Sequence, residues 1–173
     1  LAKIAVEDYG AKRPAIFYAS SETHTVGSKQ LTEILKNDYG VEVVASAQFE
    51  PDTEKDYNAH ITNFMGANAD IVFILSEYTP AGLFLKQKYA VGWDVPCLSL
   101  AGCSNPQIVE IAGKEAAEGF ISLSGFDASN PDERVQKFVK DYVDISGGVE
   151  AGEWAAGYYD AVYVFANALK DPE

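Results

Sequence analysis

The sequence is poor in positive charge, in cysteine and in histidine. Thirteen Lys and Arg residues stand against 26 Asp and Glu residues, so the formal net charge of the 173-residue chain is −13. Such a charge repels phosphate backbones and anionic lipid head groups, and we therefore expect no nucleic acid and no membrane surface among its partners. The two cysteines, Cys97 and Cys103, and the two histidines, His24 and His60, lack the spacing of a zinc site. The sequence implies no cofactor.

Long apolar runs are also missing. No window approaches the roughly 20 apolar residues that span a bilayer, and the richest, residues 155–169, is interrupted by Gly157, Asp160 and Asn167. The chain does not start with a basic and then apolar segment, so we expect any signal peptide to have been removed or to lie outside this sequence. Hydrophobic residues nevertheless make up 47% of the chain, too many for a disordered acidic tail. The length suits one domain with a sizeable core.

The two cysteines are expected to be unpaired. Cys97 lies in an apolar run that predicts a strand, whereas Cys103 follows the end of that run, so their sulfur atoms should point apart. We expect a buried Cys97 and a loop Cys103, both reduced.

Short apolar runs alternate along the chain with longer segments of helical spacing, and Gly and Pro separate them. Strands alternating with helices, without hairpin signals, predict an α/β fold with a parallel three-layer sheet. After residue 123 the pattern changes to helices alone, a C-terminal helical extension. The expected strands are residues 14–19, 41–47, 71–75, 96–100 and 120–123, and the expected helices lie around residues 1–9, 26–39, 57–65, 80–91, 105–112, 130–142 and 153–169.

Right-handed connections bring every strand-to-helix loop of such a sheet to one edge, and ligands bind beyond the carboxyl ends of the strands. The candidate binding loops are therefore residues 20–25, 49–56, 76–79 and 101–104.

The first loop carries the hydroxyls of Ser20, Ser21 and Thr25 beside the imidazole of His24. A hydrolase would use a serine as nucleophile and His24 as its base, but the G-x-S-x-G turn that exposes such a serine is not present. A hydroxyl-rich loop that binds a ligand, or that caps the helix beginning near Val26, is the favoured interpretation.

The loop after the 71–75 strand consists of Ser76, Glu77, Tyr78 and Thr79. Its carboxylate, phenol and two hydroxyls suit a small ligand. They equally suit a solvated turn in which the start of the next helix favours a negative charge at Glu77.

The loop after the 96–100 strand consists of Ala101, Gly102, Cys103 and Ser104. Its backbone donors and small side chains, next to a helix start, could hold an anionic group such as a carboxylate. A lone thiol there leaves a cysteine enzyme open, with His24 as the base. The simplest alternative is a turn of small residues.

Seven short stretches follow one another in an order that covers nearly the whole chain. They are RPAIFY at 13–18, GVEVV at 40–44, KDY at 55–57, ADIVF at 69–73, LKQ at 85–87 with VGW at 91–93, AEGF at 117–120, and Trp154 with the aromatic YYDA at 158–161. Together they resemble the second lobe of the periplasmic solute-binding proteins of branched-chain amino-acid ABC transporters, the Leu/Ile/Val-binding class.

The resemblance implies a receptor without catalysis, a type I periplasmic binding protein in which two α/β lobes close on a solute in the cleft between them. Residues 1–121 would be the second lobe, and residues 122–173 would form the return crossing and the helices that pack on the first lobe. The protein would be the extracytoplasmic solute-binding component of an ABC importer. It would be periplasmic or extracellular, with a lipid anchor as one option for the intact protein. Its partners would be a small solute, an amino acid or a relative, and the permease subunits in the membrane.

The resemblance also assigns binding positions, and this chain departs from them. The aromatic that stacks on the ligand after the first strand falls at His24, and the one after the third strand at Tyr78 or, without a gap, at Glu77. The acidic residue that holds the ammonium group falls at Ala101, which cannot pair with a buried charge. Either Glu77 replaces that acid, with Asp127 as a weaker alternative, or the solute is not an α-amino acid.

Two other functions remain open at this point, an effector-sensing domain of a transcription regulator and a small α/β enzyme that uses Cys103 or Ser21 with His24. A chain without the first lobe would also expose Phe138, Tyr159 and Phe165, and we expect it to associate as a two-fold homodimer.

Overall fold

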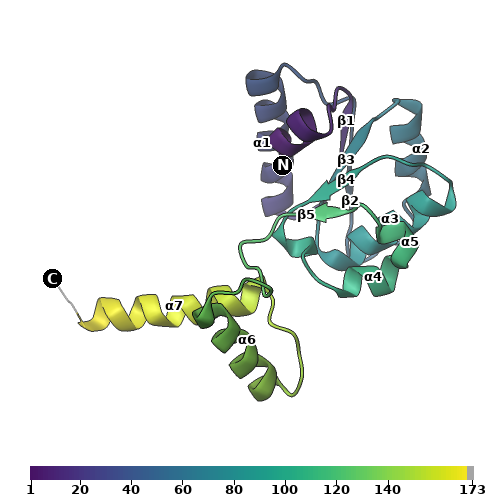
Figure 1. The fold of residues 1–173 in the computed structure, drawn as a ribbon. Helices are drawn as coiled ribbons and strands as arrows, with labels where there is room; N and C mark the ends of the chain where they lie inside the picture. The colour runs from purple at the N-terminus through teal and green to yellow at the C-terminus, as the bar shows by residue number, and fades with distance from the viewer. Residues whose placement is uncertain (171–173) are drawn as a thin grey trace. The chain divides into compact units, whose positions relative to one another are not determined.

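Five parallel strands form one sheet in the order β2-β1-β3-β4-β5 (Figure 1), which confirms the predicted α/β class. The computed structural model describes residues 1–170. Within it, the sheet belongs to a unit that runs from Leu1 to Leu123, and a second, helical unit begins at Ser124. The strands are β1 (Pro14–Ala19), β2 (Ala45–Phe49), β3 (Ile71–Leu75), β4 (Cys97–Ser99) and β5 (Ile121–Ser122).

Helices cover both faces of the sheet. The π-helical segment η1 (Ile4–Asp8) and α1 (Glu22–Tyr39) pack on one face, while α2 (Asn58–Gly66), α3 (Tyr78–Ala90), α4 (Gln107–Ala112) and α5 (Lys114–Ala117) pack on the other (Figure 1). Because both faces are covered, all five residues of β3 are buried, as expected for a parallel strand in the middle of such a sheet.

An aromatic cluster forms the centre of the face that is covered by α2, α3, α4 and α5. Phe17 of β1 is fully buried and stacks on Phe49 of β2 with ring centroids 4.3 Å apart. The rings of Tyr57 and Phe84 lie 4.9 and 4.7 Å from that of Phe17. The cluster thereby joins β1 and β2 to the helical layer.

The predicted second strand, residues 41–47, was misplaced. Pairing with β1 begins at Ala45, opposite Ala15, and continues to Phe49. The valines that suggested an earlier start are half-buried and lead the chain into the sheet, where the Val44 N–H donates to the Pro14 carbonyl at 2.9 Å. The apolar run therefore includes residues that precede the strand, so its start did not give the start of the strand.

Two helices begin earlier than predicted. α1 starts at Glu22 rather than near Val26, because the Ser21 hydroxyl caps it by accepting the His24 N–H at 3.3 Å. α3 starts at Tyr78, so Pro80 lies within its first turn. Several residues expected in binding loops therefore lie in the first turns of helices.

The unit that begins at Ser124 contains α6 (Glu133–Ser146) and α7 (Glu153–Lys170). Asp132 caps α6 by accepting the Arg134 N–H at 2.9 Å. The predicted exposure of Phe138 is wrong, because its ring is buried against Phe126 and against Tyr159 of α7, whose ring centroid lies 4.8 Å away.

The rest of α7 keeps its apolar side chains exposed. Phe165 is 72% exposed and Tyr158 74%. Even so, no helix within residues 1–170 is both long enough and apolar enough to cross a membrane. The exposed apolar side chains of α7 are Trp154, Tyr158, Tyr159, Val162, Tyr163, Val164, Phe165 and Leu169.

We predict that the 173-residue chain associates in solution through this helix, because large exposed apolar patches are rare on monomers. Sedimentation velocity should show a fraction of dimer that increases with protein concentration. The double variant Tyr158→Glu, Phe165→Glu should be monomeric. A parent chain that stays monomeric at the highest attainable concentration would contradict this prediction.

Candidate functional site

The candidate site lies where the strands of the sheet end. Parallel pairing sets Ala19 opposite Phe49, Tyr18 opposite Leu75, and Ile74 opposite Ser99. The segments that follow β1, β2, β3 and β4 therefore leave the sheet at the same edge, as predicted. Hydrogen bonds and close contacts then join these segments to one another.

Ser20 connects the end of β1 to the end of β2. Its N–H donates to the Phe49 carbonyl at 2.9 Å, and its hydroxyl donates to Glu50 Oε2 at 2.7 Å. Glu50 was not singled out in the sequence, and its position directly after the buried Phe49 was the signal that could have identified it. A second connection joins α1 to β2, because the Gln48 side-chain amide donates to the Thr25 hydroxyl at 3.2 Å.

His24 lies in the first turn of α1, with its Nδ1 atom 2.7 Å from the Ser21 hydroxyl. That hydroxyl also accepts the backbone N–H of His24 at 3.3 Å. Burial lowers the pKa of His24, and the nearby charge of Glu77 opposes that shift. Burial is the larger of the two effects, so it favours a neutral imidazole.

Glu77 is the residue that precedes α3, and its carbonyl accepts the Ala81 N–H at 3.3 Å. Its side chain is exposed and does not cap the helix. The next two residues are in the helix, where Tyr78 is half-buried against the aromatic cluster and Thr79 is exposed. The predicted loop at 76–79 therefore consists of Ser76 and Glu77, and Tyr78 and Thr79 belong to α3.

The carboxylate of Glu77 lies against Gly102, on the segment that follows β4. A Cβ atom at Gly102 would be 2.9 Å from Glu77 Oε2 and 3.1 Å from the Ser76 carbonyl oxygen. Glu77 thus connects the segments that follow β3 and β4.

Ser76 and Cys103 hold the ends of β3 and β4 together. The Cys103 thiol is buried and donates to the Ser76 carbonyl at 3.1 Å, and the Ser76 hydroxyl donates to the Glu77 carbonyl at 3.0 Å. Within the two strands, the buried Ser99 hydroxyl of β4 donates to the Ile74 carbonyl of β3. Cys103 does lie in the turn that follows β4, as expected, but its thiol is buried in the core.

Neither cysteine has the properties of a nucleophile. Both are free and buried, and burial raises the pKa of Cys97 to about 12 and that of Cys103 to about 11. The reactive form of cysteine is the thiolate, which needs a lowered pKa.

Residues 101–104 form a tight turn. Ala101, Gly102 and Cys103 make the short 3₁₀ helix η2 (Ala101–Cys103), followed by the half-buried Ser104. The N–H groups of Cys103 and Ser104 donate to the carbonyls of Leu100 and Ala101. These two donors are therefore used within the turn, which fits the alternative of a turn of small residues better than an anion site.

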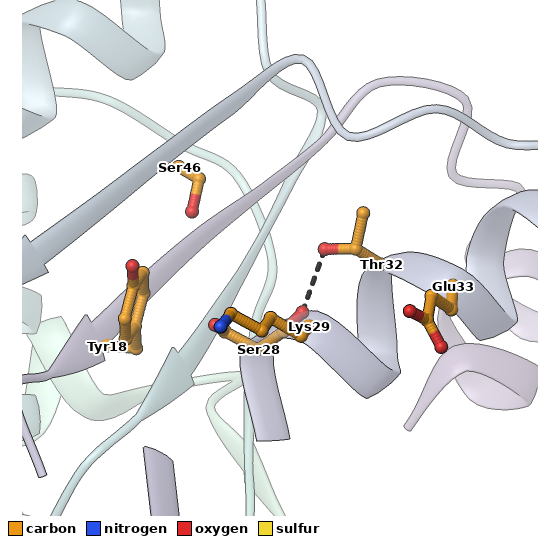
Figure 2. A pocket seen from close by; sticks show the side chains of 6 residues that line it. All are labelled: Tyr18, Ser28, Lys29, Thr32, Glu33 and Ser46. Carbon is orange, nitrogen blue, oxygen red and sulfur yellow. Dashed lines mark hydrogen bonds between the residues drawn. The ribbon is translucent and has the colours of Figure 1, made fainter. Parts of the chain in front are cut away.

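A pocket of about 290 Å³ lies between α1 and the strands β1 and β2, on the face of the sheet that α1 covers (Figure 2). Its lining differs from all twelve predicted site residues. The polar side of β2, where Ser46 and Gln48 alternate with Ala45 and Ala47, was the sequence signal for it. The lining residues are Tyr18, Ser28, Lys29, Thr32, Glu33 and Ser46, with the Thr32 hydroxyl donating to the Ser28 carbonyl at 2.8 Å.

Among residues 1–170, no three His, Cys, Asp or Glu side chains are placed to hold a metal ion.

The parallel sheet with polar groups collected at its carboxyl edge defines a ligand-binding α/β lobe, as in type I periplasmic binding proteins. The sequence model of the periplasmic binding protein family matches residues 1–172, and the chain belongs to this family. No curated relative matches the chain in sequence.

Solved structures agree with this assignment. The chain is 28% identical to the leucine-binding protein LivK of Thermotoga maritima, with a TM-score of 0.82 over 98% of this chain and 47% of that one. It is 25% identical to LivJ of Streptococcus pneumoniae, a branched-chain amino acid transporter substrate-binding protein in complex with isoleucine, with a TM-score of 0.79 over 96% of this chain and 47% of that one. The chain therefore spans about half the length of these proteins.

A third structure shares the fold. It is the solute-binding protein of an ABC transporter from Rhodopseudomonas palustris, in complex with 3,4-dihydroxybenzoic acid. It is 20% identical, with a TM-score of 0.78 over 98% of this chain and 46% of that one. The same fold therefore holds a solute that has no amino group.

Proposed function

We propose that the chain is part of the solute-binding component of an ABC importer, acting in the periplasm or outside the cell, with or without a lipid anchor. The observation that carries the proposal is the close approach of Glu77, which follows β3, to Gly102, which follows β4, at the carboxyl edge of the sheet, in a chain of the periplasmic binding protein family. The solute would be an amino acid or a related small molecule, delivered to permease subunits in the membrane.

The chain would supply one side of an interlobe cleft. Residues 1–121 would form the second lobe, and residues 122–173 would cross back and pack on a first lobe in a longer protein. Two observations support this division. The chain spans 47% of the LivK and LivJ structures, and α7 keeps a row of apolar side chains exposed, as a helix does when it has a further surface to cover.

The proposed ligand-binding residues surround the carboxyl edge. We place the solute against His24, Glu77 and Tyr78, with hydroxyls around it. The full set is Ser20, Ser21, His24, Thr25, Ser76, Glu77, Tyr78, Thr79, Ala101, Gly102, Cys103 and Ser104.

Binding without catalysis is the function that this geometry favours. The Cys103 thiol is buried and its pKa is raised, which disfavours a cysteine nucleophile. The remaining alternative, the sensing domain of a transcription regulator, predicts a DNA-binding domain encoded upstream. An importer component predicts a signal peptide and a first lobe encoded upstream, next to permease genes.

The test is a ligand screen on the intact two-lobe protein. We expect thermal unfolding to shift upward by several degrees with one class of small solute, because a ligand that binds only the folded state stabilises it. Calorimetry with the twenty amino acids, 4-methylpentanoate and 3,4-dihydroxybenzoate would then identify the class. If none of these solutes binds at millimolar concentration, the proposed function is contradicted.

A further inference from the structure

We propose that the polar pocket between α1 and the strands β1 and β2 is a second ligand site, separate from the carboxyl edge of the sheet, for a small hydroxylated acid. Lys29, Tyr18 and Ser46 would bind the anionic oxygens of such a ligand. Glu33, one turn further along α1, would accept hydrogen bonds from its hydroxyls. The proposal goes beyond the proposed function, because the lining shares no residue with the set placed around the carboxyl edge.

The pocket exists because α1 packs closely on only part of the sheet. Leu31 and Leu35 of α1 are buried in one apolar cluster with Ile16 of β1. β2 offers this face no apolar side chain, since alternation along the strand directs Ser46 and Gln48 toward it, and both are exposed. The edge of the sheet therefore leaves a space of about 290 Å³ beside the helix (Figure 2), close to the volume of small-molecule sites.

Three hydrogen-bond donors in this pocket have no partner among residues 1–170. The hydroxyls of Ser28 and Thr32 are used within α1, where both donate to backbone carbonyls. Figure 2 marks only the bond of Thr32 among the six side chains of the lining, so the hydroxyls of Tyr18 and Ser46 remain available. Lys29 takes part in none of the six ion pairs of the described residues.

These donors require acceptor oxygens in the ligand, and charged oxygens form the stronger bonds. A carboxylate or a phosphate group supplies them. In Figure 2, Lys29 extends toward Tyr18, whereas Glu33 lies beyond Thr32. The anionic group of the ligand would therefore lie at the Lys29 end of the pocket, away from the negative charge of Glu33.

The other end of the pocket favours hydroxyls in the ligand. The Glu33 carboxylate accepts hydrogen bonds and would repel a second negative charge. Four of the six lining residues carry hydroxyls, whose oxygens both donate and accept, and a ligand with hydroxyls of its own matches them better than an alkyl ammonium does. Sugar acids and sugar phosphates combine an anionic group with several hydroxyls.

Calorimetric titration of the intact protein with four compounds tests each part of this ligand. Gluconate and glucose 6-phosphate carry both an anionic group and hydroxyls, glucose carries hydroxyls alone, and 4-aminobutyrate has a carboxylate and an ammonium group. We expect at least one of the two hydroxylated acids to bind about tenfold more tightly than glucose and 4-aminobutyrate. The tighter of the two acids identifies the anionic group as a carboxylate or a phosphate.

Variants then place the binding in this pocket. Lys29→Met should weaken binding of the hydroxylated acid about tenfold, and Tyr18→Phe and Ser46→Ala about threefold each. Lys86→Met is the matched control and should change nothing, because Lys86 is an exposed lysine of α3 that is also absent from the six ion pairs. Each variant should keep the unfolding temperature of the parent, which shows that a loss of binding is not a loss of fold.

No binding of either hydroxylated acid at millimolar concentration would overturn the proposal, as would binding that Lys29→Met leaves unchanged. Equal losses in Lys29→Met and Lys86→Met would also overturn it, because they would reveal a general effect of charge. Glucose or 4-aminobutyrate that binds as tightly as the acids would contradict the assigned class of ligand. A solute at the carboxyl edge should bind Lys29→Met as it binds the parent, so the proposed function is tested separately.

Discussion

Replacing Phe17 by alanine should lower the free energy of unfolding by about 3–5 kcal/mol. Phe17 is fully buried at the centre of the aromatic cluster, where it contacts Phe49, Tyr57 and Phe84 at once. The change removes a large apolar surface and leaves a cavity between β1, β2 and the helical layer, which these rings cannot refill without leaving their own positions.

Urea denaturation followed by circular dichroism measures this loss. The matched control is Tyr89→Ala, which removes an aromatic side chain that is 58% exposed near the end of α3. We expect the control to stay within about 0.5 kcal/mol of the parent. Equal losses in the two variants would show that the cluster around Phe17 does not carry the stability of this unit.

Replacing Gly82 by alanine should also destabilise the protein, by about 1–3 kcal/mol. Alanine is the better helix former, so helix propensity alone predicts the opposite sign. In α3, however, a Cβ at this position would lie 2.9 Å from two side-chain carbons of Ile111 and 3.3 Å from the Ile108 carbonyl. The substitution would force α4 away from α3.

Gly27→Ala in α1 is the control for helix propensity. Its Cβ would meet only Leu75 Cδ1, at an ordinary contact distance of 3.9 Å. We expect this variant to be as stable as the parent or more stable by up to about 1 kcal/mol. If both glycine variants gain stability, the close contact between α3 and α4 is not present in solution.

The order and type of the strands could be predicted because burial on both faces leaves a simple pattern. β1 and β3 are continuous apolar runs, and their predicted and observed bounds coincide. The second strand was predicted too early in the sequence. β2 lies at the sheet edge, where Ser46 and Gln48 are exposed, so the apolar Val41–Val44 segment before it resembles a strand more closely. The starts of α1 and α3 were predicted too late, because Ser21 caps α1 and Pro80 lies within the first turn of α3.

The candidate site was predictable only as a set of loops. Topology alone brings the segments after the strands to one edge, and residues 20–25, 76–79 and 101–104 follow from it. Which groups remain free depends on side-chain directions that no spacing reveals. The thiol of Cys103 turns into the core, Thr25 bonds to Gln48, and the contact between Glu77 and Gly102 joins residues 25 positions apart.

The hydrogen bonds that join the strand ends have a consequence for the energetics of recognition. Ser20 is bonded to Phe49 and Glu50, Ser99 to Ile74, and Cys103 to Ser76, all within the unit Leu1–Leu123. Because these bonds form within the unit itself, the conformational entropy of ordering this edge is lost when the unit folds. A solute that meets such a preorganised surface should associate quickly, and differences in affinity between solutes should appear mainly in their dissociation rates.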